Sequence, residues 1–124
     1  MPISSETYEE LRAPFDRVFR LEGKFDYITG EQSISRLNMC LGPFNWNFQI
    51  LEHGVSDDGD EIWCRGEMTA SDPETGSTVR RQQFGGQQLK MKRDSGKVLS
   101  FADDLKAAAT DCLKRCAVSL GVAL

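Results

Sequence analysis

The sequence is short of the residues and runs on which most enzymes and membrane proteins depend. It has one histidine, His53, and four prolines among 124 residues. No apolar run approaches the roughly 20 residues that a membrane-spanning helix requires. The first 15 residues lack the basic stretch and apolar block of a secretory signal. We therefore expect a cytoplasmic protein that does not cross a membrane.

The four cysteines do not form a recognisable metal-binding or disulfide pattern. They are Cys40, Cys64, Cys112 and Cys116, without a C-x-x-C pair and without a cysteine near His53. The four-residue spacing of Cys112 and Cys116 suits one face of a helix. We interpret all four as buried thiols in a reducing compartment, with a disulfide framework or a metal site as the alternatives.

The chain also lacks the motifs of nucleophilic catalysis and phosphate binding, such as G-x-S-x-G and the P-loop. The pair Gly85–Gly86 is interpreted as a strand end. The turn "SDDGDE" carries Asp57, Asp58 and Asp60, but not at the spacing of an EF-hand. We expect no enzyme, no metal or other cofactor and no small-molecule substrate. A hydrolase that uses the three aspartates is a lesser alternative.

Charge is divided unevenly along the chain. Residues 1–79 hold 15 acidic and six basic residues, whereas residues 80–124 hold four acidic and nine basic residues. At physiological salt a charge acts over about 8 Å, so a local basic surface can exist on a protein with a net charge of −4.

The first 43 residues predict two helices around an extended segment. Ser4 or Ser5 can cap a helix that Pro14 ends. Residues 16–28 alternate as an extended segment, with Gly23 at a turn or bulge. Helical spacing then runs over residues 29–41, and Gly42–Pro43 stops it.

Three strands and a long helix follow. Strand patterns cover residues 46–55, 61–70 and 78–86, joined by turns rich in Asp, Pro and Gly. Residues 87–100 read as a basic hairpin or a loop, and the longest helix runs from an N-cap at Ser100 to about Leu120. We predict a single α+β domain over residues 1–124: an antiparallel β-meander with the long C-terminal helix packed on the sheet and a shorter helix before it.

The long helix carries two adjacent cations. Its predicted apolar stripe, which should cover the sheet, consists of Phe101, Leu105, Ala109, Cys112, Leu113, Cys116 and Leu120. Lys114 points away from this stripe, and Arg115 lies at its edge. The residues around Lys114 are small or short: Ala107, Thr110, Ala117 and Val118. Such a face would let another subunit or a sugar–phosphate backbone approach, although two cations near a helix C-terminus can simply complement its dipole.

Other cations and aromatic residues are candidates for the same surface. Arg80 and Arg81 should point to opposite faces of a strand. Lysine and arginine also alternate with apolar residues along one basic edge, at Lys90, Lys92, Arg93 and Lys97. An aromatic residue at a strand position is more often core than a stacking platform, so we do not assign stacking to Tyr27, Trp46, Trp63 or Phe84.

Two separated segments resemble the Rad-fifty-two-type single-strand annealing family. The first, "KFDYITGEQSISRLNMCLGPFNW", places the family's pattern at Lys24, Tyr27, Ile28, Gly30, Ile34, Asn38, Leu41, Gly42 and Trp46. The second is "LSFADDLKAAATDCLKRCAVSLGVAL", and "DCLKRCAV" within it is most similar to the bacterial DNA-damage-response (DdrA-type) branch. The resemblance covers residues 17–124.

The resemblance implies a β-β-β-α fold whose protomers join side by side into a ring that holds single-stranded DNA in a groove. It assigns the groove floor to Lys114 and Arg115, and a second family arginine falls on Val118. A further groove cation corresponds to Arg17, or to Arg20 if the register slips, and an outer site corresponds to Lys97. The candidate DNA-binding residues are Arg17, Arg20, Lys24, Arg80, Arg81, Lys97, Lys114 and Arg115.

We therefore expect a homo-oligomeric single-stranded-DNA-binding protein of the nucleoid that serves recombination and repair without ATP or metal. It would anneal complementary strands or protect DNA ends. The alternative is an oligomeric protein-interaction module that binds no nucleic acid. Members of the family usually continue beyond this point, so residues 1–124 are either the whole protein or the N-terminal core of a longer one.

Overall fold

The computed structural model describes residues 4–15, 19–21, 25–90 and 100–122. It has the predicted α+β architecture, with helices α1 (Ser5–Arg12), α2 (Gly30–Leu41) and α3 (Phe101–Leu120). A short antiparallel hairpin, β1 (Phe19–Leu21) and β2 (Phe25–Tyr27), precedes α2. The main sheet is the predicted meander of β3 (Trp46–Val55), β4 (Glu61–Ser71) and β5 (Thr78–Gln88). Both predicted early helices are confirmed.

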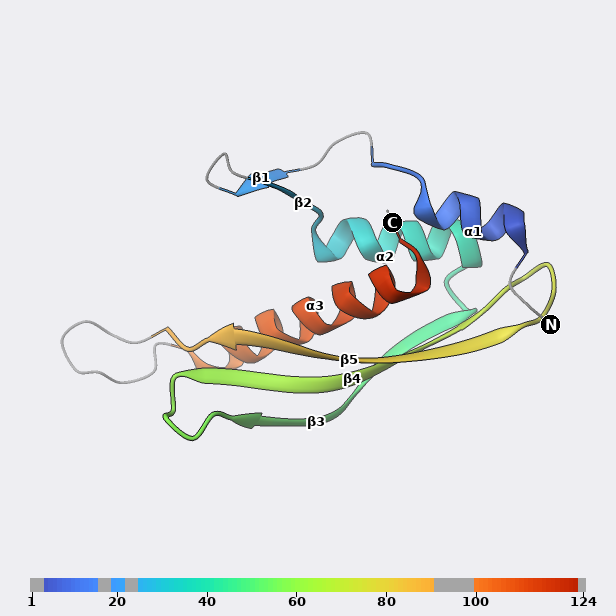
Figure 1. Cartoon of the computed structure of the whole chain (residues 1–124). Coiled ribbons are helices and arrows are strands. Elements are labelled where there is room, and N and C mark those ends of the chain that lie inside the picture. The colour runs from blue at the N-terminus through green and yellow to red at the C-terminus, as the bar shows by residue number, and fades with distance from the viewer. Residues whose placement is uncertain (1–3, 16–18, 22–24, 91–99, 123–124) are drawn as a thin grey trace.

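The molecule is layered, with α3 between the sheet and a layer that contains α2 (Figure 1). Strand β4 is central, and every second residue of it is buried, from Ile62 to Ala70. This alternation is the period of a strand with one face against a helix. Strands β3 and β5 are the two edges of the sheet, and the β3–β4 register shifts between Ile50 and Glu52.

Helix α3 lies directly against the backbone of the sheet. A Cβ atom added at Gly85 would lie 2.6 Å from the carbonyl oxygen of Ala108 and 2.7 Å from the Cα atom of Cys112. At Gly66, a Cβ atom would lie 2.9 Å from the Sγ atom of Cys112. The interpretation of Gly85 as a strand end was therefore wrong: β5 continues to Gln88, and the glycine is where the helix backbone comes closest.

The buried face of α3 differs in part from the predicted stripe. Its buried residues are Asp104, Ala108, Cys112, Cys116, Ala117 and Leu120. Ala108, not Ala109, is fully buried, and Phe101 is 43% exposed. The carboxylate of Asp104 can be buried because it accepts a hydrogen bond from the backbone N–H of Lys90 at 3.0 Å. A polar residue therefore occupies the buried face of α3 at this point, and its hydrogen bond fixes the segment that follows β5.

Capping interactions fix the helix ends. Ser100 caps α3, as predicted, and Thr29 forms a reciprocal capping box with Gln32 at the start of α2. Gly121 ends α3 in the left-handed conformation, with φ of 116°.

Two buried charged residues attach α1 to the rest of the protein. Asp72, after β4, accepts hydrogen bonds from the N–H of Ser4 at 2.6 Å and the hydroxyl of Thr7 at 3.1 Å. Arg36 of α2 donates to the carbonyl oxygens of Leu11 and Ala13 at 2.9 and 2.6 Å. Asp72 thus holds the start of α1 and Arg36 holds its end.

All four cysteines are buried free thiols, as predicted. Burial raises the pKa of Cys64 to about 11 and also raises the pKa values of Cys112 and Cys116. The thiols therefore stay protonated at neutral pH, and those of Cys64, Cys112 and Cys116 donate to backbone carbonyl oxygens across the α3–sheet interface. No helix in the described part of the chain has the length and apolarity to span a membrane.

Candidate nucleic-acid interface

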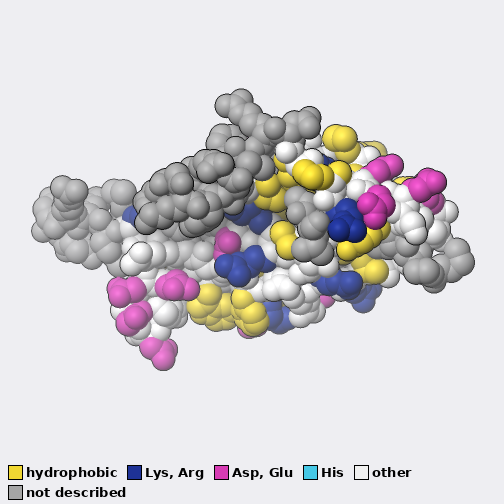
Figure 2. Space-filling model, turned by 45° about the horizontal axis from the view of Figure 1, so that its top comes forward, with side chains coloured by type: hydrophobic (Ala, Val, Ile, Leu, Met, Phe, Trp, Pro, Cys, Tyr) yellow, Lys and Arg dark blue, Asp and Glu magenta, His cyan; other side chains and the backbone are white. Residues whose placement is uncertain are grey.

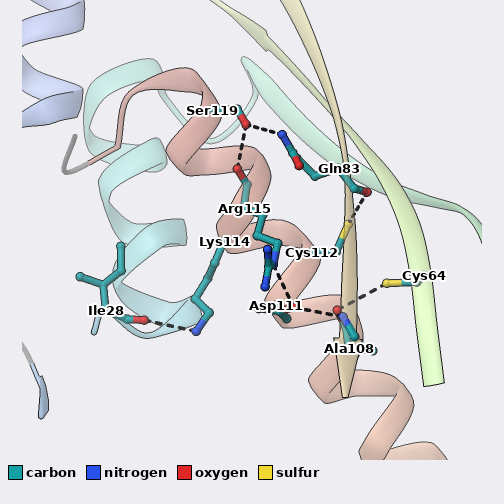
Figure 3. A network of polar contacts seen from close by, with 10 residues as sticks. Ile28, Cys64, Gln83, Ala108, Asp111, Cys112, Lys114, Arg115 and Ser119 are labelled. Carbon is teal, nitrogen blue, oxygen red and sulfur yellow. Dashed lines mark hydrogen bonds and ion pairs between the residues drawn. The ribbon is translucent and has the colours of Figure 1, made fainter. Parts of the chain in front are cut away.

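Lys114 and Arg115 leave α3 in different directions (Figure 3). The half-buried Lys114 donates from Nζ to the carbonyl oxygen of Ile28 at 3.4 Å, across to the segment that follows β2. The adjacent residue is turned about 100° around the helix. Of the two predicted cations, Lys114 therefore hydrogen bonds to the segment before α2, whereas Arg115 lies beside the sheet.

Arg115 is the more open of the two cations. Its side chain is 62% exposed, and its Nε atom donates to Asp111 Oδ2 at 3.1 Å. The same oxygen accepts from the backbone N–H of Gly86 in β5 at 3.0 Å. An exposed ion pair of this kind contributes at most about 1 kcal/mol. It leaves most of the guanidinium in solvent and holds it beside the edge of β5.

The contact line between α3 and β5 is hereafter called the α3–β5 seam. It is formed by Asp111, Arg115 and Ser119 of α3 and by Arg81, Gln83 and Gly86 of β5. Gln83 donates from Nε2 to the hydroxyl of Ser119 at 2.8 Å, and that hydroxyl donates to the carbonyl oxygen of Arg115 at 3.0 Å (Figure 3). Hydrogen bonds thus hold the two elements together on both sides of Arg115.

Arg80 and Arg81 are exposed and lie on opposite faces of β5, as predicted. Arg81 pairs with the buried Met68 and so lies on the α3 side, whereas Arg80 pairs with Thr69 on the other side. Figure 2 shows Lys and Arg side chains gathered across the middle of one face of the molecule, with Asp and Glu mostly towards its ends. Because Arg81 lies on the α3 side of β5, the seam carries two cations, Arg81 and Arg115.

The face around Lys114 is open only in part, because Thr110 and Val118 are exposed as predicted whereas Ala117 is buried. Ala117 is fully buried. The Cγ2 atom of Thr110 is packed so closely on α2 that a Cβ atom added at Gly30 would lie 2.6 Å from it. Val118, at the position of the second family arginine, is 40% exposed. Small side chains are needed here because α3 contacts a helix on one side and a sheet on the other.

A hollow of about 460 Å³ lies between the start of α2 and the middle of α3. It is lined by Thr29, Gly30, Glu31, Ile34, Thr110 and Leu113. Lys114 and Ile28, which hydrogen bond to each other, are the sequence neighbours of two lining residues. The hollow is therefore adjacent to Lys114 but carries no cation of its own.

Three predicted DNA-binding residues, Arg17, Lys24 and Lys97, lie outside the described residues, as do Lys92 and Arg93. Arg20 lies in β1, opposite Asp26 of β2 in the backbone register. The β1–β2 hairpin is on the side of α3 away from the sheet (Figure 1). The structure thus places Lys114 and Arg115 on neighbouring faces of α3 and Arg81 on the α3 side of β5, while Arg80 faces away.

The sequence analysis missed Gln83 and Ser119 of this site, and also Asp111, the carboxylate partner of Arg115. Asp111 precedes Arg115 by four residues, the spacing at which oppositely charged side chains on a helix meet. That spacing was a usable signal. The hydrogen bond to Gly86 was not predictable, because it depends on how α3 lies across β5.

Other candidate positions have structural explanations. Trp46 donates its indole N–H to Asn38 at 2.8 Å and packs against the core. In the acidic turn, Asp58 accepts hydrogen bonds from the hydroxyl of Ser56 and the N–H of Asp60, in that order the main reasons why its pKa is lowered. Within the described ranges, no group of three or more His, Cys, Asp or Glu residues is arranged to hold a metal ion.

Comparison of the chain with protein-family models and with curated protein sequences found no match. The family resemblance noted in the sequence therefore stays a prediction.

Proposed function

We propose that this chain is an oligomeric, ring-forming single-stranded-DNA-binding protein for homologous recombination and DNA repair. It anneals complementary strands or protects DNA ends, and it needs no ATP or metal. The observation that carries the proposal is the α3–β5 seam, where Arg115 and Arg81 are both exposed on the α3 side of an edge strand without carboxylates. The two motifs that resemble the annealing family include this same helix.

The proposed mechanism is electrostatic retention of the phosphate backbone. Arg115 and Arg81 contact phosphates, and Lys114 adds positive charge on the next face of α3. Affinity arises from charge and counterion release, so sequence preference is slight. Repetition of the site around a ring adds avidity to a weak single site. Bases that are left unpaired in the complex are then available to a complementary strand.

The test is the binding of a fluorescent oligo-dT to the Lys114→Ala/Arg115→Ala variant. We expect affinity to fall at least tenfold, and the slope of log affinity against log salt to become shallower by about 0.7 for each phosphate that the variant no longer neutralises. Arg12→Ala is the matched control, because it removes an exposed cation from α1. Unchanged affinity in the double variant, or a flat salt dependence in the wild type, removes the proposed site.

A second candidate function is an oligomeric protein-interaction module without nucleic-acid binding. The specific observation in its favour is the exposure of Met39 (78%) and Phe44 (96%) at the α2–β3 connection. Large apolar side chains this exposed are typical of contact surfaces when they are grouped. Displacement of the labelled oligonucleotide by poly-dT supports the first function. Failure of the chain to bind that oligonucleotide, together with a mass lowered by Met39→Ser/Phe44→Ser, supports the second.

A further inference from the structure

Contrary to the expectation that aromatic residues at strand positions belong to the core, Phe84 is exposed, on the opposite side of β5 from α3. Its side chain is 61% exposed, and its ring centroid is 6.3 Å from that of Trp63 on the neighbouring strand. Its register partner, Arg65, alternates along β4 with residues buried under α3. No described element covers this face of the sheet (Figure 1). The two rings therefore form an aromatic surface that the chain itself does not use for its core.

The rings of Phe84 and Trp63 are tilted by 57° to each other, and the surroundings of Trp63 leave its ring open. Both of its register partners are glycines, Gly54 on β3 and Gly86 on β5. A Cβ atom at Gly54 would lie only 2.9 Å from the indole, so the ring lies across the β3 backbone. No side chain from either partner position rises beside the ring. Such a surface can receive a planar group from solvent.

The charges on this face are mixed: three carboxylates, Glu52, Glu61 and Glu67, lie there with two cations, Arg65 and Arg80, and the Glu61 carboxylate lies beside Gly86. Strand β5 contains two arginines, four glutamines and no carboxylate. Nearby, Glu52 is paired with Arg65 at 2.7 Å, and Glu67 accepts a hydrogen bond from Gln82 at 2.7 Å. Both of these β-strand carboxylates are thus engaged by the chain itself. Arg80 adds an exposed cation on the same face.

The aromatic surface is next to the phosphate site because β5 is an edge strand. Gly86, whose N–H shares Asp111 with Arg115, is two residues beyond Phe84, or about 7 Å along the strand. The cations of the seam and the ring of Phe84 are therefore separated by little more than one strand. A polynucleotide that lies along this edge, which pairs with no other described strand, can contact both.

We propose that Phe84, with Trp63 beside it, is a stacking site for an unpaired base of the single strand whose phosphates the α3–β5 seam holds. The inference rests on the proposed function and adds a base-contacting surface to it. Stacking of a base on an aromatic ring is tolerant of sequence, because every base has a π-face. The site would therefore strengthen binding without selecting a sequence.

The experiment compares oligo-dT with an abasic oligonucleotide of the same length, which has the phosphates but no bases. We expect Phe84→Ala to weaken oligo-dT binding about tenfold and to leave abasic binding unchanged. Phe44→Ala, which removes another exposed phenylalanine, should change neither affinity. In a Trp46→Phe background, Trp63 is the remaining tryptophan, and oligo-dT but not the abasic strand should quench its fluorescence.

Four results would overturn the inference. If Phe84→Ala binds oligo-dT like the wild type, or weakens both oligonucleotides equally, bases do not stack at this site and only the phosphate contacts remain. If the variant has a lower native mass, Phe84 is a contact between copies of the chain. If the wild type binds neither oligonucleotide, the proposed function fails and the stacking site fails with it.

Discussion

Arg36 and Arg115 are both arginines on helices, yet their surroundings give them opposite roles. Arg36 is 9% exposed, donates to three carbonyl oxygens at the end of α1 and lies 4.1 Å from the ring centroid of Phe15. The side chain of Arg115 is 62% exposed and has one carboxylate partner. A guanidinium is available to a ligand only where the chain's own backbone does not occupy its donors. Position in the fold, not charge, therefore separates the buried arginine from the exposed one.

The largest expected effect comes from removing the structural arginine. Arg36→Ala should lower the free energy of unfolding by about 3 kcal/mol, because three carbonyl oxygens lose a charged donor and Phe15 loses its stacking partner. Urea unfolding measures this loss. Arg12→Ala, at an exposed ion pair, should change stability by no more than about 0.5 kcal/mol. Equal losses in the two variants would abolish the distinction between the two kinds of arginine.

The seam itself depends on two adjacent glycines with different surroundings. Gly85→Ala should cost about 2 to 3 kcal/mol, because its Cβ atom would meet backbone atoms of Ala108 and Cys112 that cannot move separately. Gly86→Ala should cost less than about 1 kcal/mol, because its Cβ atom would meet the flexible carboxylate of Glu61 at 2.9 Å. Thermal unfolding of both variants checks this difference. If the two variants had a similar Tm, α3 would have to move away from the sheet to accept the Cβ atom at residue 85.

The hydrogen bonds between Asp72 and the start of α1 should make the stability of the protein sensitive to acid. Burial alone would raise the pKa of Asp72, but hydrogen bonds from the N–H groups of Ser4 and Glu74 and from the Thr7 hydroxyl outweigh it, so the pKa is lowered. The resulting stability is present above about pH 4, the ordinary carboxyl pKa, and is lost as pH falls through the lower folded value.

Asp72→Asn removes this contribution. At pH 7 the variant should be about 1 to 2 kcal/mol less stable than the wild type. Its stability should also fall less between pH 5 and pH 3, which urea unfolding at the two pH values measures. A fall as steep as that of the wild type would assign the acid sensitivity to other carboxylates.

The smallest effect is expected at the carboxylate beside Arg115. Asp111→Asn keeps an oxygen that can accept from Gly86 but removes the charge that competes with phosphate for Arg115. Affinity for oligo-dT should rise about two- to fivefold, as measured by fluorescence anisotropy. Asp103→Asn removes the same charge from the first turn of α3. An equal rise in both variants would reflect net charge rather than the seam.

Local signals predicted the elements well. The cap at Ser100 and the Asp, Pro and Gly turns each act over a few residues, so they were predicted without knowledge of the fold. The capping box at Thr29 is equally local, but it was not predicted. Alternation in β4 and the burial of the cysteines follow from the same short-range periodicity. The opposite directions of Arg80 and Arg81 also follow from the pleat of one strand.

Contacts between distant segments could not be predicted in this way. The helical projection erred by about one residue, because the exact face of α3 is chosen by its approach to Gly66 and Gly85. Ala117 was assigned to an open face because nothing local shows that α2 covers α3.

The amino-acid sequence by itself determined the order of the elements, their caps and the uneven distribution of charge. Only the tertiary structure decided which cations stay available, since Arg36 became buried against α1 while Arg115 came to lie beside β5. The physical reason is range. Capping and pleating are set by neighbours along the chain, whereas exposure and hydrogen-bond partners are set by segments that meet only when the sheet and helices pack.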